Sequence, residues 1–402
     1  MLKNIIFVSD FGYINGGNSK VTIENALLAS KHFNVTLFVG EDKLDDRILN
    51  SNINVVKAGG EEFLKSKHKI NSSFKFIYDK AIYKKFDSLL EKFDKNDTII
   101  HIHSWPKVLS PSIFKAINKR GFKILITCHD YFSVCPNGGL FNYKKQTICN
   151  CKNRFSCYFK NCDSRSYIYK IIRNFRYDVQ HKYMSKIEKK GNLNFGIISK
   201  SQEQHFRKVF KNASYHFIPN NIELFNGDRI KVENNKKLLY IGRLSEEKGV
   251  NLLLEAMKNL PYELDVIGDG PLFEKLSKNN ALPNVRFLGW YNKPQINEAL
   301  LEARAVIFPS IWHEGSPLLI PEVMSAGIPT LVSDVCNGKD FIKDGENGWL
   351  VNVNSKSEFI QKLDNIFKTD ISEISKHAYE IRRNYTSAIF DKYLNVLKEV
   401  LN

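Results

Sequence analysis

Long hydrophobic runs are missing from this sequence of 402 residues. No apolar run in it approaches the ~18–20 consecutive apolar residues needed to span a bilayer. The stretch Met1–Asp10 has only a short apolar run without a cleavage-type site. That pattern is typical of a buried first strand and not of a signal peptide. We therefore expect an intracellular protein with no membrane-spanning segment.

Two other patterns are also missing. No Gly-x-Gly-x-x-Gly follows the first apolar strand, which argues against a dinucleotide-dependent dehydrogenase. No repeat with a period of ~20–50 residues is evident, which argues against a solenoid. Hydrophobic residues make up 43% of the chain, enough for a sizeable core, and the length predicts two or three domains.

Acidic residues are scarce in the first half of the chain. Residues 1–220 hold 37 Lys and Arg against 18 Asp and Glu, whereas residues 221–402 hold 22 against 25. The stretch 144–211 alone carries 17 basic and 4 acidic residues. This excess indicates either a solvated lysine-rich surface or attraction to an anionic partner such as a phospholipid face, a lipid diphosphate or nucleic acid.

Short apolar strands alternate with longer mixed segments along the whole chain, which is typical of a parallel doubly wound sheet. The pattern restarts in the second half, so the sequence predicts two Rossmann-like halves. Helices are expected at Val21–Lys31, Phe74–Phe93, Glu246–Leu260 and Pro271–Asn279. Strands are expected at Asn4–Ser9, Val35–Val39, Ile53–Lys57, Thr98–His103, Lys123–Thr127, Phe195–Ser199, Lys237–Ile241, Glu263–Ile267, Val285–Phe287, Ala305–Phe308, Thr330–Ser333 and Trp349–Val351.

The domain boundary is expected where Phe217–Ile222 ends a strand in a Pro-Asn-Asn breaker followed by a polar stretch. We therefore predict an N-terminal domain over residues 1–220 and a C-terminal domain over 221–384. The segment 385–402 contains an apolar-periodic helix that could pack on either half.

Two loops of the second half carry the residues best suited to bind an anion. In the first, a strand ends at Gly242, Arg243 follows at once, and Lys248 opens a helix five residues later. Arg243 offers a bidentate fork to phosphate oxygens, and Lys248 adds a point charge. In open α/β sheets, ligands bind beyond the carboxyl ends of the strands, where such loops lie.

The second loop follows the strand that ends at Phe308. Two carboxylates, Glu314 and Glu322, flank a predicted helix start in which Pro317 suits the first turn because its missing N–H would be unpaired there. Glu322 is placed to accept a hydrogen bond from a ribose hydroxyl. The backbone N–H groups expected to be free for an anion are those of Gly315, Ser316, Leu318 and Leu319.

These motifs resemble those of the retaining nucleotide-sugar glycosyltransferases of family four, which have the GT-B fold. The resemblance rests on Gly-Arg-x-x-x-x-Lys-Gly at 242–249, Glu-Gly-x-Pro at 314–317 with Glu322, and Gly-x-Pro at 327–329. In the first half, Asn15-Gly16-Gly17, Thr127-Cys128-His129-Asp130-Tyr131 and Ile218-Pro219-Asn220-Asn221-Ile222 resemble the glycine loop, the His-Asp-Tyr element and the hinge of that family. The fold class implied is α/β, GT-B, with two Rossmann-like doubly wound domains facing each other across a cleft.

The resemblance also implies the roles of individual residues. Arg243 and Lys248 would bind the donor diphosphate together with the N–H groups near Ser316–Leu319, and Glu322 would hold the ribose. Glu314 would contact hydroxyls of the donor sugar, while His129, Gly16 and Gly17 approach the donor from the other domain. His129, Glu314, Arg243 and Lys248 would carry the catalysis. No cofactor or metal is implied, because the two cations and a helix N-terminus stabilise the leaving diphosphate.

The function implied is a metal-independent retaining hexosyltransferase. Its donor is a UDP- or GDP-sugar and its acceptor is a lipid-linked or polysaccharide molecule of cell-envelope biosynthesis. Its basic half is expected to rest on the anionic inner face of the cytoplasmic membrane. The alternatives are a nucleic-acid-binding protein that uses the basic half, and a GT-B epimerase or phosphorylase. The base, sugar, linkage, pathway and oligomeric state stay open.

Six of the seven cysteines fall within residues 128–162. The last four of them, Cys149, Cys151, Cys157 and Cys162, have a spacing that is not a standard zinc signature. In an intracellular chain, either a structural zinc or a set of reduced thiols is consistent with them. We expect this segment to be an insertion that faces the acceptor.

Overall fold

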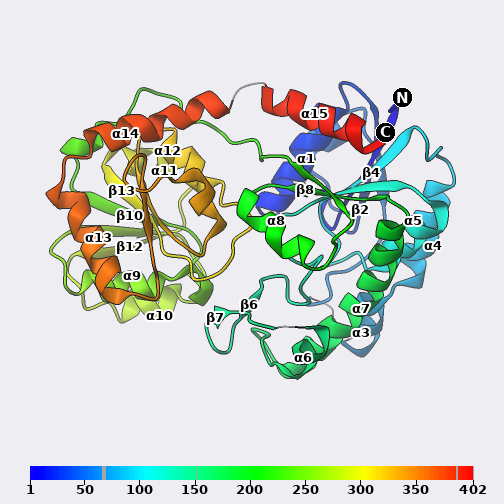
Figure 1. The fold of residues 1–402 in the computed structure, drawn as a ribbon, viewed down its shortest axis with the longest axis horizontal. Coiled ribbons are helices and arrows are strands. Elements are labelled where there is room, and N and C mark those ends of the chain that lie inside the picture. The colour runs from blue at the N-terminus through cyan, green and yellow to red at the C-terminus, as the bar shows by residue number, and fades with distance from the viewer. Residues whose placement is uncertain (66–68, 152, 386–387, 402) are drawn as a thin grey trace. The chain divides into compact units, whose positions relative to one another are not determined.

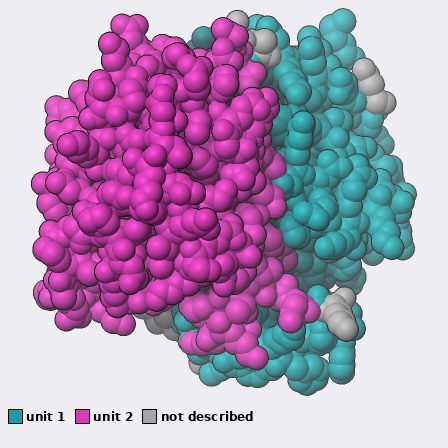
Figure 2. All heavy atoms as spheres, turned by 60° about the vertical axis from the view of Figure 1, so that its left-hand side comes forward, with its two compact units in different colours: residues 1–139, 151–221, 387–402 teal, residues 140–150, 222–386 magenta. Residues whose placement is uncertain are grey.

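The computed structural model describes residues 1–65, 69–151, 153–385 and 388–401, which divide into two compact units (Figures 1 and 2). Unit 1 contains residues 1–139, 151–221 and 387–402, and unit 2 contains residues 140–150 and 222–386. Each unit is built on its own parallel sheet, with helices packed against it. The prediction of two Rossmann-like halves is confirmed.

Unit 1 has a seven-stranded sheet in the order β3-β2-β1-β4-β5-β8-β9, in which every pair is parallel. The first strand, Asn4–Ser9, lies at the centre, and its side chains are buried from Ile5 to Ser9. Its continuous apolar run is expected for a strand that is covered on both faces. The strands are β1 Asn4–Ser9, β2 Asn34–Val39, β3 Asn54–Lys57, β4 Thr98–Ile102, β5 Lys123–Thr127, β8 Leu193–Ile197 and β9 Ser214–Phe217.

The helices of unit 1 differ from the predicted ones at two points. The helix predicted at Val21–Lys31 begins four residues earlier, at Gly17, and ends at Ala29. The predicted single helix Phe74–Phe93 is two helices, because the carboxylate of Asp79 accepts hydrogen bonds from the backbone N–H groups of Ala81 and Ile82 and so begins a new helix. The helices are α1 Gly17–Ala29, α2 Asp46–Leu49, α3 Lys69–Ile77, α4 Lys80–Leu90, α5 Ser112–Arg120, α6 Arg154–Phe159, α7 Tyr167–Lys189 and α8 Lys200–Arg207.

The helix α15 Ala388–Leu401 packs on the sheet of unit 1, although residues 222–386 of unit 2 separate it in the chain from the rest of unit 1. The buried side chains of this helix share one core with those of β1, β2 and α1. The hydroxyl of Tyr393 lies 2.9 Å from Nδ1 of His101, and Nζ of Lys123 donates to the carbonyl of Leu401 at 2.7 Å. The core side chains that α15 contributes are Tyr393, Leu394, Val396, Leu397 and Val400.

Unit 2 has a six-stranded parallel sheet in the order β12-β11-β10-β13-β14-β15. Numbered from its own first strand, this is the 3-2-1-4-5-6 order of the doubly wound nucleotide-binding fold. The strands are β10 Lys237–Ile241, β11 Glu263–Ile267, β12 Val285–Gly289, β13 Ala303–Phe308, β14 Thr330–Ser333 and β15 Trp349–Val351. The helices are α9 Val250–Met257, α10 Phe273–Lys278, α11 Lys293–Leu301, α12 Leu319–Met324, α13 Lys356–Lys368 and α14 Ser372–Tyr379, with short 3-10 turns at η1 Val232–Asn234, η2 Glu246–Lys248, η3 Asn337–Phe341 and η4 Glu380–Asn384.

One segment of the predicted N-terminal domain 1–220 groups with unit 2. It is a small antiparallel hairpin made of β6 Phe141–Asn142 and β7 Thr147–Ile148. Gln146, Thr147 and Ile148 line a pocket together with residues of unit 2, which is why the hairpin belongs there. The boundary near the predicted hinge lies between Asn221 and Ile222.

Candidate functional site

The order of the strands in unit 2 points to one place for a ligand. The strand order reverses between β10 and β13, and ligands of open α/β sheets bind at such a reversal, beyond the carboxyl ends of the strands. The loop after β10 carries Arg243 and Lys248, and the loop after β13 carries Glu314. The two loops that the sequence analysis singled out are therefore the two that flank this point.

Glycines hold these loops against their neighbours through backbone contacts. Gly249 has φ 71°, and a Cβ at this position would lie 1.9 Å from the carbonyl oxygen of Pro309. Gly268, in the loop after β11, has φ 135°, and a Cβ there would lie 1.9 Å from the carbonyl oxygen of Gly242. No L-side chain fits at either position. The backbone at Gly249 and at Gly268 can therefore approach its neighbour this closely only because both residues are glycine. The N–H of Ile311 also donates to the carbonyl of Glu247 at 3.0 Å.

Lys248 and Glu314 form the central ion pair of this site. Nζ of Lys248 lies 2.8 Å from Oε2 of Glu314, whose side chain is 10% exposed. The hydroxyl of Ser310 donates to the other carboxylate oxygen of Glu314, and the side-chain amide of Asn337 donates to its backbone carbonyl. Burial alone would lower the pKa of Lys248, but the charge and hydrogen bond of Glu314 outweigh it and raise this pKa above its ordinary value. Lys248 is therefore charged at neutral pH.

Arg243 is the cation of this site that is left available to a ligand. Its side chain is exposed, and none of the described residues offers it a hydrogen-bond or ion-pair partner. The hydroxyl of Tyr240 donates to its backbone carbonyl at 2.9 Å and fixes the main chain there. An arginine fork on a fixed backbone suits a diphosphate, whereas Lys248 shares its charge with Glu314.

The helix after Glu314 starts later than predicted. It begins at Leu319, so Pro317 precedes it, and Pro321 lies inside its first turn, where a missing N–H breaks no helical hydrogen bond. Within the described chain, we find no acceptor for the backbone N–H groups predicted to be free, those of Gly315, Ser316, Leu318 and Leu319. Because α12 has only six residues, these individual N–H groups supply the positive end, with little contribution from a helix dipole.

Glu322, the predicted ribose ligand, lies on α12 and is also paired. Its Oε2 lies 2.8 Å from Nζ of Lys293, the first residue of α11. The sequence analysis did not find Lys293. Asn292 and Gln295 form a capping box that begins α11, and this signal in the sequence could have marked Lys293 as part of a helix start. It could not have shown that this helix start lies beside Glu322.

In unit 1, the strand order reverses between β1 and β4. The loop after β1 holds Gly16 and Gly17, and α1 begins at Gly17 with Gly16 at φ 128° in front of it. The side-chain amide of Asn18 donates to the carbonyl of His103 at 3.2 Å, which fastens the start of α1 to the end of β4. The predicted glycines therefore lie at the place where this sheet would bind a ligand.

His129 follows β5 and pairs with another histidine. Its Nε2 lies 2.9 Å from Nδ1 of His103, and the two rings are stacked with centroids 5.2 Å apart. Burial lowers the pKa of His129 to about 3 and also lowers that of His103, so both rings are neutral and one donates to the other. The sequence analysis missed His103 and His101. His101 lies in β4 and His103 directly follows this strand, and their i, i+2 spacing predicts that both side chains project on the same side, which could have been read from the sequence.

Two buried carboxyl groups in unit 1 were not among the predicted site residues. Asp10 accepts backbone N–H bonds from Lys107, Val108 and Leu109, and burial nonetheless raises its pKa to about 6. Burial likewise raises the pKa of Asp130, beside His129, to about 6. Such groups change charge near neutral pH and lie at the ends of β1 and β5.

The cysteines do not form a metal site in the described part of the chain, where no group of three or more His, Cys, Asp and Glu residues is placed to hold an ion. All seven cysteines have free thiols. Nζ of the buried Lys170 donates to Sγ of Cys157 at 3.0 Å.

The part of the chain that the structure describes also has no helix long and apolar enough to cross a membrane.

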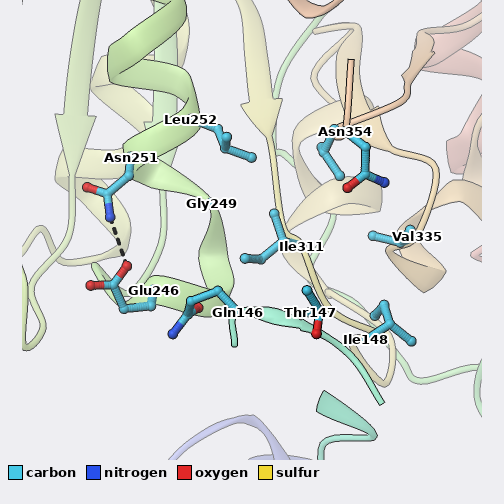
Figure 3. Close-up of a pocket in the computed structure, with 11 residues that line it drawn as sticks. Gln146, Thr147, Ile148, Glu246, Gly249, Asn251, Leu252, Ile311, Val335 and Asn354 are labelled. Carbon is cyan, nitrogen blue, oxygen red and sulfur yellow. Dashed lines mark hydrogen bonds between the residues drawn. The ribbon is translucent and has the colours of Figure 1, made fainter. Parts of the chain in front are cut away.

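Unit 2 also contains a pocket of about 490 Å³ (Figure 3). Glu246, Gly249 and Asn251, at the end of the loop after β10 and the start of α9, line one part of it. Ile311 and Val335 point into it, and the hairpin residues Gln146–Ile148 lie across it. None of the predicted donor-binding side chains lines this pocket. It is therefore separate from the group formed by Arg243, Lys248 and Glu314.

Comparisons with known proteins bear on this arrangement. Residues 204–385 match the family described as Glycosyl transferases group 1. The chain is 28% identical over 174 residues to the lipopolysaccharide 1,6-galactosyltransferase of Salmonella typhimurium, a stretch that covers 38% of this chain and 48% of that protein. It is 33% identical over 135 residues to the UDP-Gal:alpha-D-GlcNAc-diphosphoundecaprenol alpha-1,3-galactosyltransferase of Escherichia coli, covering 31% and 34%. The chain spans less than half the length of these curated relatives.

Among solved structures, Anabaena HepE in complex with UDP superposes with a TM-score of 0.65 at 13% identity, over 98% of this chain and 100% of that one. At this identity the likeness concerns the fold. The chain as a whole has the GT-B fold, and its residues 204–385 resemble the glycosyl transferases of group 1.

Proposed function

We propose that this protein is a retaining glycosyltransferase that moves a hexose from a nucleoside-diphosphate sugar to a lipid-linked or polysaccharide acceptor of cell-envelope biosynthesis. One observation carries the proposal: Arg243, which is exposed and has no side-chain partner among the described residues, and the Lys248–Glu314 pair flank the strand reversal of a family-matched domain. The names of two relatives include galactosyl transfer, and one includes UDP-Gal as donor and a diphosphoundecaprenol acceptor.

The chemistry asks the protein to stabilise a diphosphate as the glycosidic bond breaks. In our proposal Arg243 binds the diphosphate oxygens through its fork, and the N–H groups from Gly315 to Leu319 donate to the same group. Lys248 holds Glu314 in place, so that its carboxylate accepts from hydroxyls of the donor sugar. These groups supply positive charge at the leaving group from the protein itself, so we propose a reaction without a metal ion.

Glu322 is proposed to hold the ribose. Because Lys293 already binds one of its oxygens, Glu322 is held in a fixed orientation, with its second oxygen left to accept from a hydroxyl. In unit 1, His129 and the loop of Gly16 and Gly17 are proposed to approach the donor. A neutral His129 would act there as a hydrogen-bond partner and not as a cation. We further propose that the basic half holds the enzyme on an anionic membrane surface, where lipid-linked acceptors reside.

The test is a thermal-shift panel with UDP, GDP, ADP and NAD on the parent chain and on Arg243→Ala and Glu322→Ala. A ligand at ~100 times its Kd adds about 2.7 kcal/mol to the stability of the state that binds it. We expect a shift with one nucleoside diphosphate, lost or much reduced in both variants. Arg383→Ala is the matched control, because this arginine is also exposed in unit 2 and lies outside the site.

A shift that survives both substitutions would remove the donor-site assignment. So would the lack of a shift with every diphosphate. Retention is tested separately, by NMR assignment of the anomeric configuration of the product formed from the donor that the panel identifies. An inverted product would contradict the retaining mechanism and leave the donor site intact.

A further inference from the structure

Exposed hydrophobic side chains gather on one part of unit 1. Of the twelve large hydrophobic side chains that are exposed in the described parts of the chain, five lie between residues 155 and 175. Single exposed apolar residues are ordinary, but a cluster of this kind marks an interaction surface. The five, which we name the aromatic patch, are Phe155 at 74% exposure, Phe159 at 69%, Tyr167 at 38%, Ile168 at 70% and Phe175 at 51%.

The aromatic patch is built on two helices that lie side by side, α6 and α7 (Figure 1). The rings of Phe155 and Phe159 on α6 are in edge contact, with centroids 5.1 Å apart. Tyr158 contacts Phe175 of α7 with centroids 6.2 Å apart, and the hydroxyl of Tyr167 donates to the carbonyl of Tyr158 at 2.7 Å. The patch therefore has members on both helices, which are in contact through Tyr158.

A charged side chain fastens α6 to α7 beneath this surface. Arg154 donates to the side-chain oxygen of Asn174 at 2.9 Å, to its backbone carbonyl at 2.8 Å and to the carboxylate of Asp178 at 2.7 Å. Three hydrogen bonds from one guanidinium hold the two helices in a fixed relation. The exposed rings are thus presented by a rigid base.

Basic residues continue the same face of α7 toward its C-terminal end. Ile168, Phe175, Lys182 and Lys189 are spaced seven residues apart, which places them within about 60° of one another around the helix. Lys182 and Lys189 are exposed, and so is Lys186, one turn from Lys182. We name Lys182, Lys186 and Lys189 the lysine row. It begins about 10 Å along the helix from Phe175.

Acidic residues do not offset this charge. Residues 151–190 contain eleven basic and three acidic residues. Asp163 is fully buried and pairs with Arg173 at 3.2 Å, Asp178 accepts from Arg154, and Glu188 accepts from the backbone N–H of Asn212 at 2.9 Å. The face therefore presents apolar rings at one end and positive charge along the rest.

We propose that α6 and α7 form a membrane-docking surface, in which the aromatic patch enters the headgroup region of an anionic bilayer and the lysine row contacts lipid phosphates. This deepens the proposed function, on whose membrane-bound acceptor it rests. Charge complementarity selects an anionic surface, because binding at a membrane interface gains from buried apolar side chains and from the attraction of lysines to anionic lipids. A nucleic-acid site would instead interleave its basic and aromatic residues along a groove.

The experiment is co-sedimentation of the full chain with vesicles of phosphatidylcholine alone or mixed with phosphatidylglycerol. We expect binding to the anionic vesicles only. The variant K182Q/K186Q/K189Q should bind about 100-fold more weakly, since each lysine near an anionic surface contributes roughly fivefold. The variant F155S/F159S should lose at least about tenfold, because rings that are buried in the bilayer become small and polar.

Matched controls come from the other unit. L301S removes a side chain that is 55% exposed, and K258Q/K343Q/K376Q removes three charges from exposed lysines. Both should bind vesicles like the parent. F159W provides an independent readout: the emission of the added indole should shift to the blue, and be quenched by nitroxide lipids, only with anionic vesicles.

Patch and row variants that bind as well as the parent would overturn the proposal, as would an equal loss in the controls. An unshifted F159W spectrum in sedimenting protein would also overturn it, because the patch would then stay in water. Competition by RNA with no loss in F155S/F159S would assign the charge to nucleic acid. R243A should bind vesicles normally while losing the nucleotide shift, so failure of this proposal and failure of the donor site are told apart.

Discussion

A methyl group at Gly249 should open the donor loops. Gly249 has φ 71°, and the added Cβ would lie 1.9 Å from the carbonyl oxygen of Pro309, far inside van der Waals contact. Both atoms belong to or are fixed by the main chain, so a rotamer change cannot relieve the overlap. The loop after β13 has to move, and Ile311 then loses its hydrogen bond to Glu247 and Glu314 its ion pair with Lys248.

Gly345 offers a matched control for this substitution. It has φ 78°, also in unit 2, and a Cβ there would meet no atom within 4 Å. Gly345→Ala therefore isolates the cost of the left-handed conformation, about 1–2 kcal/mol. Gly249→Ala should cost that amount plus the two lost contacts, at about 1 kcal/mol for the neutral hydrogen bond and about 1.5–3 kcal/mol for the charged one. We expect about 4–6 kcal/mol in total.

Urea unfolding of the two variants measures this difference, and the nucleoside-diphosphate thermal shift measures the site. Gly345→Ala should keep the shift in unfolding temperature that the nucleoside diphosphate causes. Gly249→Ala should lose this shift, although the variant is still folded at the start of the temperature scan. If Gly249→Ala costs no more stability than Gly345→Ala and retains the shift, the loops are not held together by backbone contact at Gly249.

Three further predictions concern groups that the structure pairs. Lys248→Met should destabilise the protein by about 1–3 kcal/mol because it leaves Glu314 without its cation, and adding Glu314→Gln should recover part of that loss. A double-mutant cycle by urea unfolding measures the coupling, and additive effects of the two substitutions would contradict the pairing. Burial lowers the pKa of His101 to about 3, so between pH 3 and 6.5 the unfolded chain binds more protons than the folded chain and stability rises with pH. His101→Gln should reduce this rise by about 1.4 kcal/mol per pH unit between pH 4.5 and 6. An unchanged slope of stability against pH would refute this expectation. Tyr393→Phe removes the hydrogen-bond partner of Nδ1 of His101 and should lower the free energy of unfolding by about 1–3 kcal/mol in the same assay. A decrease of less than about 0.5 kcal/mol would mean that α15 is held by apolar contacts alone.

The sequence predicts much of the fold because local patterns decide it. The continuous apolar run of β1 and the loops beginning at Gly242 and Gly315 can be read without the structure, since strand burial and helix starts depend on neighbouring residues. The break at Asp79 was also a local signal, because an aspartate before Ala81 and Ile82 is a helix cap, but the apolar period of Phe74–Phe93 concealed it.

Other features of the candidate site depend on which strands and helices become neighbours. Lys293 meets Glu322 because α11 and α12 begin at adjacent places in unit 2, and no spacing in the sequence states this. The pairing of His103 with His129 likewise depends on β4 lying beside β5. The aromatic patch escaped the sequence analysis for a related reason: the apolar residues of 155–175 look like core residues until their exposure is known.

The return of α15 to unit 1 has a consequence for the order in which the protein folds during synthesis. The polypeptide enters unit 2 at residue 222 and comes back only at residue 387, so the core around β1, β2 and α1 lacks Leu394, Leu397 and their neighbours until the ribosome has made α15. Unit 2 has all of its strands before that point and can form its sheet while unit 1 still lacks α15. Until α15 arrives, the apolar face of the first sheet is exposed to solvent, and a nascent chain stalled there is a natural substrate for chaperones.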